Sequence, residues 1–423
     1  MKLLILGLNY APEPIGIAVY TTGMAEALAG NGHEVQVVAA CPYYPGWKIM
    51  AGHSAFTYAR GSENGVDVTR VPHYIPAGPS GGRRLLHHCS FGLAALFPML
   101  MRAWFWRPDV VMSVAPSLIA APVARLAAGP CGAKSWLHIQ DFETEAAFAT
   151  GLLRDGGPGA RLARFFERAV LNRFDIVSTI SPFMGRRLAE KGVCADRIVE
   201  FRNWADLDAV QPGPDGSDYR AEWGITTPHV ALYSGNIANK QGTEIIVEVA
   251  RRLRERTDLT FVVCGEGPNR ANLEARAAGL TNIQFRDLQP KERLGALLGL
   301  ASIHLLPQIA GAADLMLPSK LANMLASGRP VIATAAPGTG LATEMEHCGL
   351  CTMPGDIDGF VAGISRLLDD AELCEKLGAA ARNRAQERWG KAAILNGFER
   401  QLGLLCEDRR QSAGGGIGSY GAK

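Results

Sequence analysis

The stretch Asp314-Leu-Met-Leu-Pro-Ser-Lys-Leu-Ala-Asn-Met-Leu-Ala-Ser-Gly-Arg-Pro-Val-Ile332 indicates a loop, a short helix, a stop and a buried strand. Ser319 is a good N-cap, because its hydroxyl can accept hydrogen bonds from the free N–H groups of the first helical turn. Gly328 and Pro330 end the helix, and residues 331–334 continue as a strand of the parallel type. This order of elements predicts an α/β domain.

The start of this helix has the chemistry of an anion site. Free N–H groups and the helix dipole favour phosphate after Pro318 and Ser319, and Lys320 adds a full positive charge. Asn323 shares the face of Lys320, so its amide could bind sugar hydroxyls beside that phosphate. An ordinary capped helix explains the same residues, and spacing alone leaves both interpretations open.

Length and composition limit the classes of protein to which this chain can belong. A chain of 423 residues with 48% hydrophobic and 20% charged residues is expected to form two globular domains. A net charge of +2 gives no reason to expect nucleic acid as a partner. Nine scattered cysteines indicate a reducing compartment. The apolar start is too short for a signal peptide and is better interpreted as a first strand.

The N-terminal residues predict a βαβ unit. Strands at Leu3–Leu6 and Val35–Ala40 flank a helix over Ala18–Ala29, and a loop rich in Pro and Gly runs from Asn9 to Gly16. The nicotinamide fingerprint GxGxxG is absent. By itself, Gly16 is explained equally well by a plain tight turn.

The stretch from Arg83 to Arg107 is apolar, with Arg at both ends and Trp104 and Trp106 near one end. Pro98 and the internal His and Arg residues argue against a helix that spans a membrane. Two interpretations stay open. One is a helix packed on the sheet, and the other is a patch whose aromatic and arginine side chains lie on a lipid surface.

Polar residues follow a further predicted strand, Ser135–Gln140. Ligand sites in open α/β sheets lie at the carboxyl ends of strands, so Asp141 and Glu143 are well placed. Asp141 could orient or deprotonate an acceptor hydroxyl. A structural carboxylate that caps the next helix is the alternative.

The second half repeats the phosphate-binding layout. A strand from Val230 leads into Gly235-Asn236 and then, after Lys240, into a helix. A second strand ends at the turn that contains Gly265 and Gly267, where backbone can approach a ligand closely. Lys240 is a candidate for neutralising a pyrophosphate, and a solvent-facing loop cation is its alternative.

The run Pro318-Ser-Lys-Leu-Ala-Asn-Met-Leu-Ala-Ser-Gly-Arg-Pro-Val-Ile332 resembles the donor-nucleotide motif of retaining GT-B glycosyltransferases of the family-4 type. It is most similar to the bacterial enzymes of colanic acid and related exopolysaccharide assembly. Typical members carry two glutamates eight positions apart, where this chain has Leu315 and Asn323. Most members also have Arg after the first Gly of the Gly235 loop and Lys before its second, where this chain has Asn236 and Gln241.

The resemblance implies two doubly wound, Rossmann-like α/β domains that face a central cleft, with a C-terminal helix crossing back to the first domain. The expected boundaries are 1–205 for the acceptor-side domain, 206–228 for a linker, 229–388 for the nucleotide-sugar domain, 389–410 for the crossing helix and 411–423 for a disordered tail. It implies that the loop at Gly16 faces the donor phosphates and the acceptor. It also implies a His near the acceptor, of which His138 is the nearest, and help from Asp141, Glu143 or Asp314 in positioning the sugar and acceptor.

The function implied is metal-independent transfer, without a cofactor, from a nucleotide-diphosphate sugar to a lipid-linked sugar such as a polyprenyl-diphosphate acceptor. GDP-fucose is the favoured donor, and a UDP-sugar is the alternative. The expected location is the cytoplasm, peripherally on the inner face of the cytoplasmic membrane, with contact through 83–107. A GT-B sugar-nucleotide epimerase and a non-catalytic membrane-peripheral assembly partner are two further hypotheses.

Overall fold

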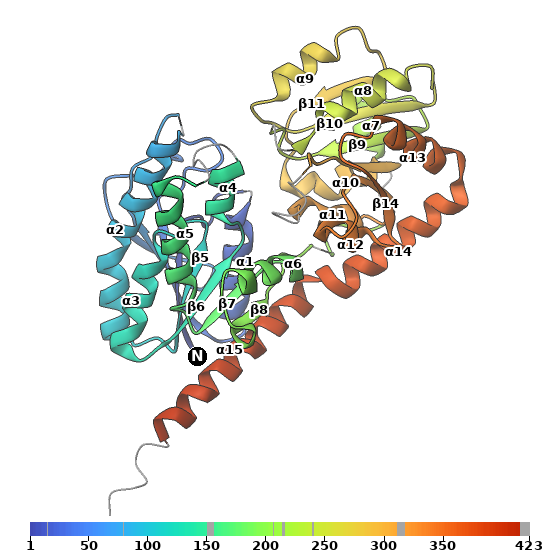
Figure 1. Ribbon diagram of the computed structural model, residues 1–423. Helices are drawn as coiled ribbons and strands as arrows, with labels where there is room; N and C mark the ends of the chain where they lie inside the picture. Colours follow the sequence, from blue (N-terminus) through green and yellow to red (C-terminus); the bar gives the residue numbers. More distant parts are fainter. Residues whose placement is uncertain are drawn as a thin grey trace, which may run out of the picture. The chain divides into compact units, whose positions relative to one another are not determined.

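The computed structural model describes residues 1–14, 16–78, 80–149, 156–205, 207–213, 216–238, 241–310 and 318–414. The chain divides into two compact units, Met1–Arg202 with Leu395–Lys423, and Asn203–Ile394. Each unit is an α/β structure with its own mainly parallel sheet (Figure 1). The prediction of two Rossmann-like α/β domains is therefore confirmed.

Eight strands form the sheet of the first unit, in the order β3-β4-β2-β1-β5-β6-β7-β8. All neighbours pair in parallel except β3, which is antiparallel to β4. The central strands are hydrophobic runs buried on both faces, as a parallel sheet covered by helices requires. The strands are β1 (Lys2–Gly7), β2 (Glu34–Ala40), β3 (Ala59–Glu63), β4 (Val66–Val71), β5 (Val110–Ala115), β6 (Lys134–Ile139), β7 (Ile176–Thr179) and β8 (Ile198–Glu200).

Helices cover both faces of this sheet. On one face, Phe91 of α2 shares a core cluster with Val111 of β5. On the other face, Phe398 of α15 stacks on Phe201 with ring centroids 4.1 Å apart and meets Trp136 of β6 edge-on at 5.1 Å. The helices are α1 (Ile17–Gly30), α2 (Gly81–Trp106), α3 (Ala121–Cys131), α4 (Glu143–Ala149), α5 (Pro158–Leu171), α6 (Pro182–Glu190) and α15 (Lys391–Gly414). Helix α15 thus continues four residues past the expected end at 410.

Six parallel strands form the sheet of the second unit, in the order β11-β10-β9-β12-β13-β14. They are β9 (His229–Ser234), β10 (Leu259–Cys264), β11 (Ile283–Arg286), β12 (Ile303–Leu306), β13 (Val331–Thr334) and β14 (Gly349–Thr352). The helices are α7 (Ser217–Trp223), α8 (Glu244–Arg252), α9 (Arg270–Arg276), α10 (Leu294–Gly299), α11 (Ser319–Ala326), α12 (Gly340–Met345), α13 (Ile357–Asp369) and α14 (Ala371–Trp389).

Helix α7 lies inside the stretch 206–228 that was expected to be a linker. Its residues Tyr219 and Trp223 are buried in a cluster with Val230 and Val262 of the sheet. Burial of two aromatic side chains explains why this Gly- and Pro-flanked segment is part of the second unit.

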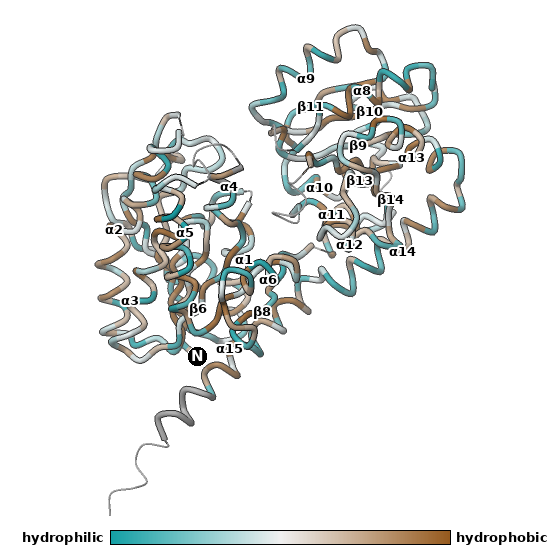
Figure 2. The backbone as a smooth tube through the Cα atoms, in the orientation of Figure 1, coloured by the Kyte–Doolittle hydropathy of each residue, from teal (hydrophilic) through white to brown (hydrophobic). Residues whose placement is uncertain are grey.

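Helix α2 has two apolar sides. Phe91 and Met99 are buried against the sheet, whereas Leu93, Phe97 and Trp104 are 75%, 66% and 66% exposed. Hydrophobic residues predominate in its second half (Figure 2). Among the described residues, α2 is the one helix whose length and composition would allow it to cross a membrane. Its inner side packs on the sheet, which confirms the interpretation as a packed helix. Its outer side leaves an apolar surface exposed.

Candidate active site

Two glycine loops meet at the carboxyl edge of the second sheet. Strands β9 and β10 are parallel neighbours whose last residues, Ser234 and Cys264, pair with each other. The glycines that follow, Gly235 and Gly265, are therefore adjacent. A Cβ atom on Gly265 would lie 1.9 Å from the carbonyl oxygen of Gly235, and its φ of 152° also favours glycine. Ligands of parallel sheets bind at this edge.

Gly267 closes the second loop against the first. A Cβ atom there would lie 2.3 Å from the carbonyl oxygen of Ile237 and 2.8 Å from Oδ1 of Asn236. The N–H of Ile237 donates to the carbonyl of Glu266 at 2.8 Å, which ties the loops together. The structure thus gathers four predicted residues in what we call the glycine cradle: Gly235, Asn236, Gly265 and Gly267.

Lys320 lies directly beside this cradle. Its Nζ donates to the hydroxyl of Tyr233 at 2.9 Å and lies 4.0 Å from the centroid of the same ring. A Cβ atom on Gly235 would be 3.5 Å from Cδ of Lys320 and 3.7 Å from its Nζ. Burial lowers the pKa of Lys320 to about 7. A partly buried ammonium at a helix start, beside two glycine loops, is suited to bind a phosphate.

Helix α11 begins one residue earlier than expected. Pro318 occupies the N-cap position with φ −61° and ψ 121°, and Ser319 is already the first helical residue. The prediction that Ser319 caps the helix is therefore wrong by one position, because proline already supplies the extended conformation before the first turn. Asn323, one turn beyond Lys320, is partly exposed.

Two predicted site residues, Lys240 and Asp314, lie outside the described residues. The described residue Gly242 lies close to the segment after β12, since a Cβ atom on it would lie 3.0 Å from the carbonyl carbon of Gln308. The backbone of Gln308 is fixed by Thr334, whose Oγ1 accepts from its N–H at 2.6 Å and donates to its carbonyl at 2.7 Å.

Tyr233 and Gln308 were not among the residues predicted for the site. The Tyr233 hydroxyl donates to the carbonyl of Asn236 at 2.6 Å, so one side chain contacts both the cradle and Lys320. Within the described residues, the buried Oε1 of Gln308 has no hydrogen-bond partner. A tyrosine just before the Gly-Asn pair is a local signal, but its contact with Lys320 crosses 87 positions.

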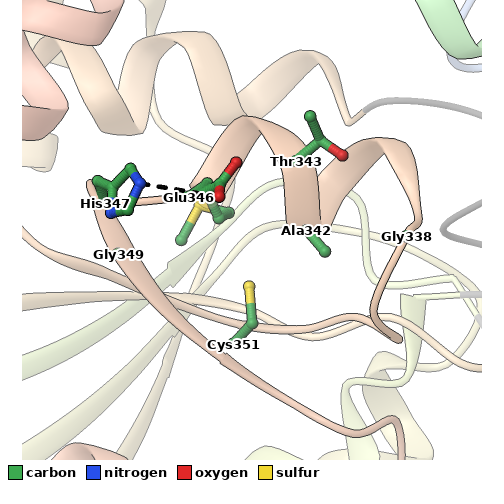
Figure 3. A pocket seen from close by; sticks show the side chains of 8 residues that line it. Gly338, Ala342, Thr343, Glu346, His347, Gly349 and Cys351 are labelled. Atoms are coloured by element: carbon green, nitrogen blue, oxygen red, sulfur yellow. Dashed lines mark ion pairs between the residues drawn. The ribbon is translucent and has the colours of Figure 1, made fainter.

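A separate hollow of about 330 Å³ lies between α12 and β14 (Figure 3). Its lining includes Gly338, Thr343 and Cys351, and none of the predicted site residues. Two adjacent lining residues, Glu346 and His347, pair at 3.7 Å, and both side chains are mostly exposed. The hollow is therefore a surface feature separate from the glycine cradle.

In the first unit, Glu143 begins α4 at the carboxyl edge of the sheet. Its Oε1 accepts from the N–H of Ser117 at 3.0 Å and its Oε2 from the N–H of Leu118 at 2.6 Å. Nε2 of His88 is 3.7 Å from Oε1. Burial raises the pKa of Glu143 to about 7, and burial lowers the pKa of His88 to about 4. This carboxyl group therefore holds the loop after β5.

The neighbouring predicted residues differ in their surroundings. Asp141 is partly exposed in the loop before α4, and its charge contributes to the raised pKa of Glu143 after burial. His138 is only 2% exposed, and its Nδ1 lies 2.9 Å from Oγ of Ser178. Burial lowers the pKa of His138 to about 3. The structure thus brings Asp141 and Glu143 together and places His138 in the core.

Gly16 is the N-cap of α1 and has a φ of 70°. The preceding loop is held by a residue that the sequence did not suggest, Glu13, which is 4% exposed. Its Oε1 accepts from the N–H groups of Tyr43 and Tyr44, both at 2.9 Å. Asn9 donates to its Oε2 at 2.8 Å. The loop that presents Gly16 is therefore fixed to the loop after β2.

Comparison with known proteins places both units in one enzyme family. Residues 16–204 match the glycosyl transferase 4-like domain, and residues 216–384 match the glycosyl transferases group 1. The chain is 41% identical over 408 residues to the Escherichia coli (strain K12) protein WcaI, named as a glycosyl transferase of colanic acid biosynthesis. That alignment covers 94% of this chain and 98% of the relative.

Solved structures share the fold. Sucrose-phosphate synthase from Thermosynechococcus elongatus superposes with a TM-score of 0.74 at 16% identity, covering 96% of this chain and 99% of that one. Anabaena HepE in complex with UDP and glucose gives a TM-score of 0.69 at 16% identity, covering 96% and 100%. The fold is therefore that of the GT-B enzymes. With two matching domains and a relative of 41% identity along almost its whole length, the chain belongs to the group 1, 4-like glycosyltransferase family and is a glycosyltransferase.

Proposed function

We propose that this enzyme is a retaining transferase of exopolysaccharide assembly that moves fucose from GDP-fucose to a polyprenyl-diphosphate-linked sugar. The donor site is supported above all by the glycine cradle and the partly buried Lys320 beside it, whose Nζ lies 3.7 Å from the Cβ position of Gly235. The identity to WcaI, named for colanic acid biosynthesis, supports the polysaccharide class. The choice of fucose rests on the resemblance of the sequence motifs.

In this proposal the reaction depends on preorganised positive charge at the donor diphosphate. As the bond to the donor sugar breaks, negative charge grows on the leaving diphosphate. The Lys320 ammonium and the free N–H groups at the start of α11 are already in place to stabilise it, without reorganisation. Lys240 adds a second cation, and Asn323 binds a donor hydroxyl. This supply of positive charge by the chain makes transfer independent of a metal ion.

Retention of configuration is proposed to follow front-face attack, in which the leaving phosphate takes the proton of the acceptor hydroxyl. Asp141 orients that hydroxyl from the loop after β6, at the carboxyl edge of the sheet where ligands of parallel sheets bind. Glu143 is committed to two backbone N–H groups and keeps the loop after β5 in place.

We also propose that the enzyme lies peripherally on the inner face of the cytoplasmic membrane through the outer side of α2. Leu86, Leu93, Phe97 and Trp104 form one line along the helix at spacings of seven, four and seven residues, and all four are at least half exposed. Neither α2 nor α3 contains Asp or Glu, whereas both contain Arg. An apolar surface on helices that carry arginine and no acidic residue fits an anionic lipid layer.

The test is a transfer assay with purified enzyme, a lipid-linked acceptor fraction and radiolabelled GDP-fucose, UDP-glucose or UDP-glucuronate, run with EDTA. Label from GDP-fucose should enter the lipid fraction, and the chelator should not reduce the rate. Transfer from a UDP-sugar alone would overturn the fucose assignment and keep the transferase. Transfer that stops with EDTA and returns with Mg²⁺ would overturn the metal-independent mechanism.

A further inference from the structure

The side chain of Lys320 is held by one aromatic residue. The hydroxyl of Tyr233 lies 2.9 Å from Nζ, and its ring centroid lies 4.0 Å from the same atom. Tyr233 itself is completely buried at the end of β9. Lysine has a long side chain with four rotatable bonds, so a fixed position for its ammonium needs such a partner.

The direction of these hydrogen bonds follows from simple counting. A phenol has a single O–H, and that of Tyr233 is used on the carbonyl oxygen of Asn236 at 2.6 Å. Its lone pairs are then left to accept from the Lys320 ammonium. One hydroxyl therefore fixes the charged group and the Gly235-Asn236 loop relative to each other.

We propose that Tyr233 is a positioning residue, which holds the Lys320 ammonium against the glycine cradle so that both bind the diphosphate of a nucleotide together. This inference rests on the proposed function, in which Lys320 binds the leaving diphosphate. It adds a residue that the family motifs in the sequence did not indicate.

Burial of the Lys320 ammonium makes this arrangement sensitive to pH. Within the described part of the chain, no carboxylate lies within 4 Å of Lys320, and Glu266 and Asp287 each pair with Arg270 at 2.7 Å. Burial lowers the pKa of Lys320 to about 7, so the free enzyme loses this positive charge as the pH rises through neutrality. The Tyr233 hydroxyl accepts from the ammonium and so favours the charged form.

The test is calorimetric titration of GDP and of UDP into the wild type, Tyr233→Phe, Lys320→Ala and the double variant, between about pH 6 and pH 9. Tyr233→Phe keeps the buried ring and removes only the hydroxyl. It should weaken binding about tenfold at pH 8, which is typical for loss of a hydrogen bond to a charged group. The loss should be smaller at pH 6, because without its acceptor Lys320 deprotonates at lower pH.

A double-mutant cycle separates positioning from mere folding. If Tyr233 acts through Lys320, its removal in the Lys320→Ala background should change affinity less than twofold. Tyr219→Phe is the matched control, since this buried tyrosine of the same unit bonds instead to Gln289 at 3.2 Å. Equal affinity of wild type and Tyr233→Phe at pH 8, or additive losses, would overturn the role of Tyr233. Failure of the wild type to bind either nucleotide would instead overturn the donor site, and this proposal with it.

Discussion

The carboxylate of Glu143 accepts a hydrogen bond from the backbone N–H of Leu118 at 2.6 Å, which joins the first residue of α4 to the loop after β5. The N–H of Ser117 donates to the other oxygen at 3.0 Å. Leu118 and Ser117 are 6% and 2% exposed, so water cannot easily replace these bonds. The contacts of this residue, which was predicted to act in catalysis, therefore hold the loop after β5 in place.

Replacement of Glu143 by Ala should destabilise the first unit by about 2–4 kcal/mol, because two buried N–H groups lose their acceptor. The change is measured as the shift of the urea midpoint followed by circular dichroism. Glu143→Gln keeps one amide oxygen and should cost about half as much. Glu190→Ala, which breaks only an exposed pair with Arg187, should stay within about 0.5 kcal/mol. An unshifted midpoint for Glu143→Ala would show that the loop does not depend on this carboxylate.

The pH dependence of stability should carry the signature of Glu143. Burial raises its pKa from 4.5 to about 7, so between these values the folded protein keeps a proton that the unfolded chain has released. Stability therefore falls as the pH rises through this window. Between about pH 5 and pH 8 the wild type should lose about 1–3 kcal/mol relative to Glu143→Gln, measured by urea unfolding at each pH. Parallel curves for the two proteins would contradict the raised pKa.

Lys320→Ala should lower kcat by about a hundredfold to a thousandfold, or about 2–4 kcal/mol, if the ammonium stabilises charge on the leaving diphosphate. Steady-state rates at saturating donor measure this, with thermal unfolding as the check of the fold. Lys291→Ala, an exposed lysine of the same unit, is the control and should leave the rate unchanged. A folded Lys320→Ala enzyme with wild-type kcat would remove Lys320 from the reaction.

The outer side of α2 should be needed for binding to lipid but not for folding. Phe97→Ser with Trp104→Ser should reduce co-sedimentation with phosphatidylglycerol vesicles at least fivefold, since each exposed aromatic adds apolar area to the contact. Phe56→Ser, which alters a side chain 89% exposed outside α2, should sediment like the wild type. If the double variant sediments like the wild type, the outer side of α2 does not bind lipid and would instead bind a protein partner or a second copy of this chain.

The elements with regular hydrophobic patterns were the predictable part of the fold. The βαβ unit at the N-terminus and the strands before Gly235 and Gly265 are found where the sequence indicates them. The β3–β4 hairpin was not predicted, because all residues of β3 are at least partly exposed and form no apolar run. Helix α7 was also not predicted, since the Pro and Gly residues that flank it are typical of a linker. Its two buried aromatic residues are too few to indicate a helix.

The residues of the candidate site also fall into those that the sequence could predict and those that it could not. Gly235, Gly265 and Gly267 could be predicted, because a close backbone approach leaves glycine in the sequence itself. Glu13 and Tyr233 could not, because their roles depend on partners 30 and 87 positions away. A carboxylate in a proline-rich loop or a tyrosine in a strand is ordinary until the fold supplies those partners.

The interlocked loops of the second unit have a consequence for how this sequence can change. Because the Cβ position of Gly265 falls 1.9 Å from the carbonyl of Gly235, any change of backbone path at one loop has to be matched at the other. The two loops are therefore expected to change together during evolution. A side chain at Gly265 or Gly267 would meet the backbone of the other loop, whereas the exposed Asn236 can change with less disturbance. If the cradle binds the donor diphosphate as proposed, a change of donor should therefore leave these glycines in place.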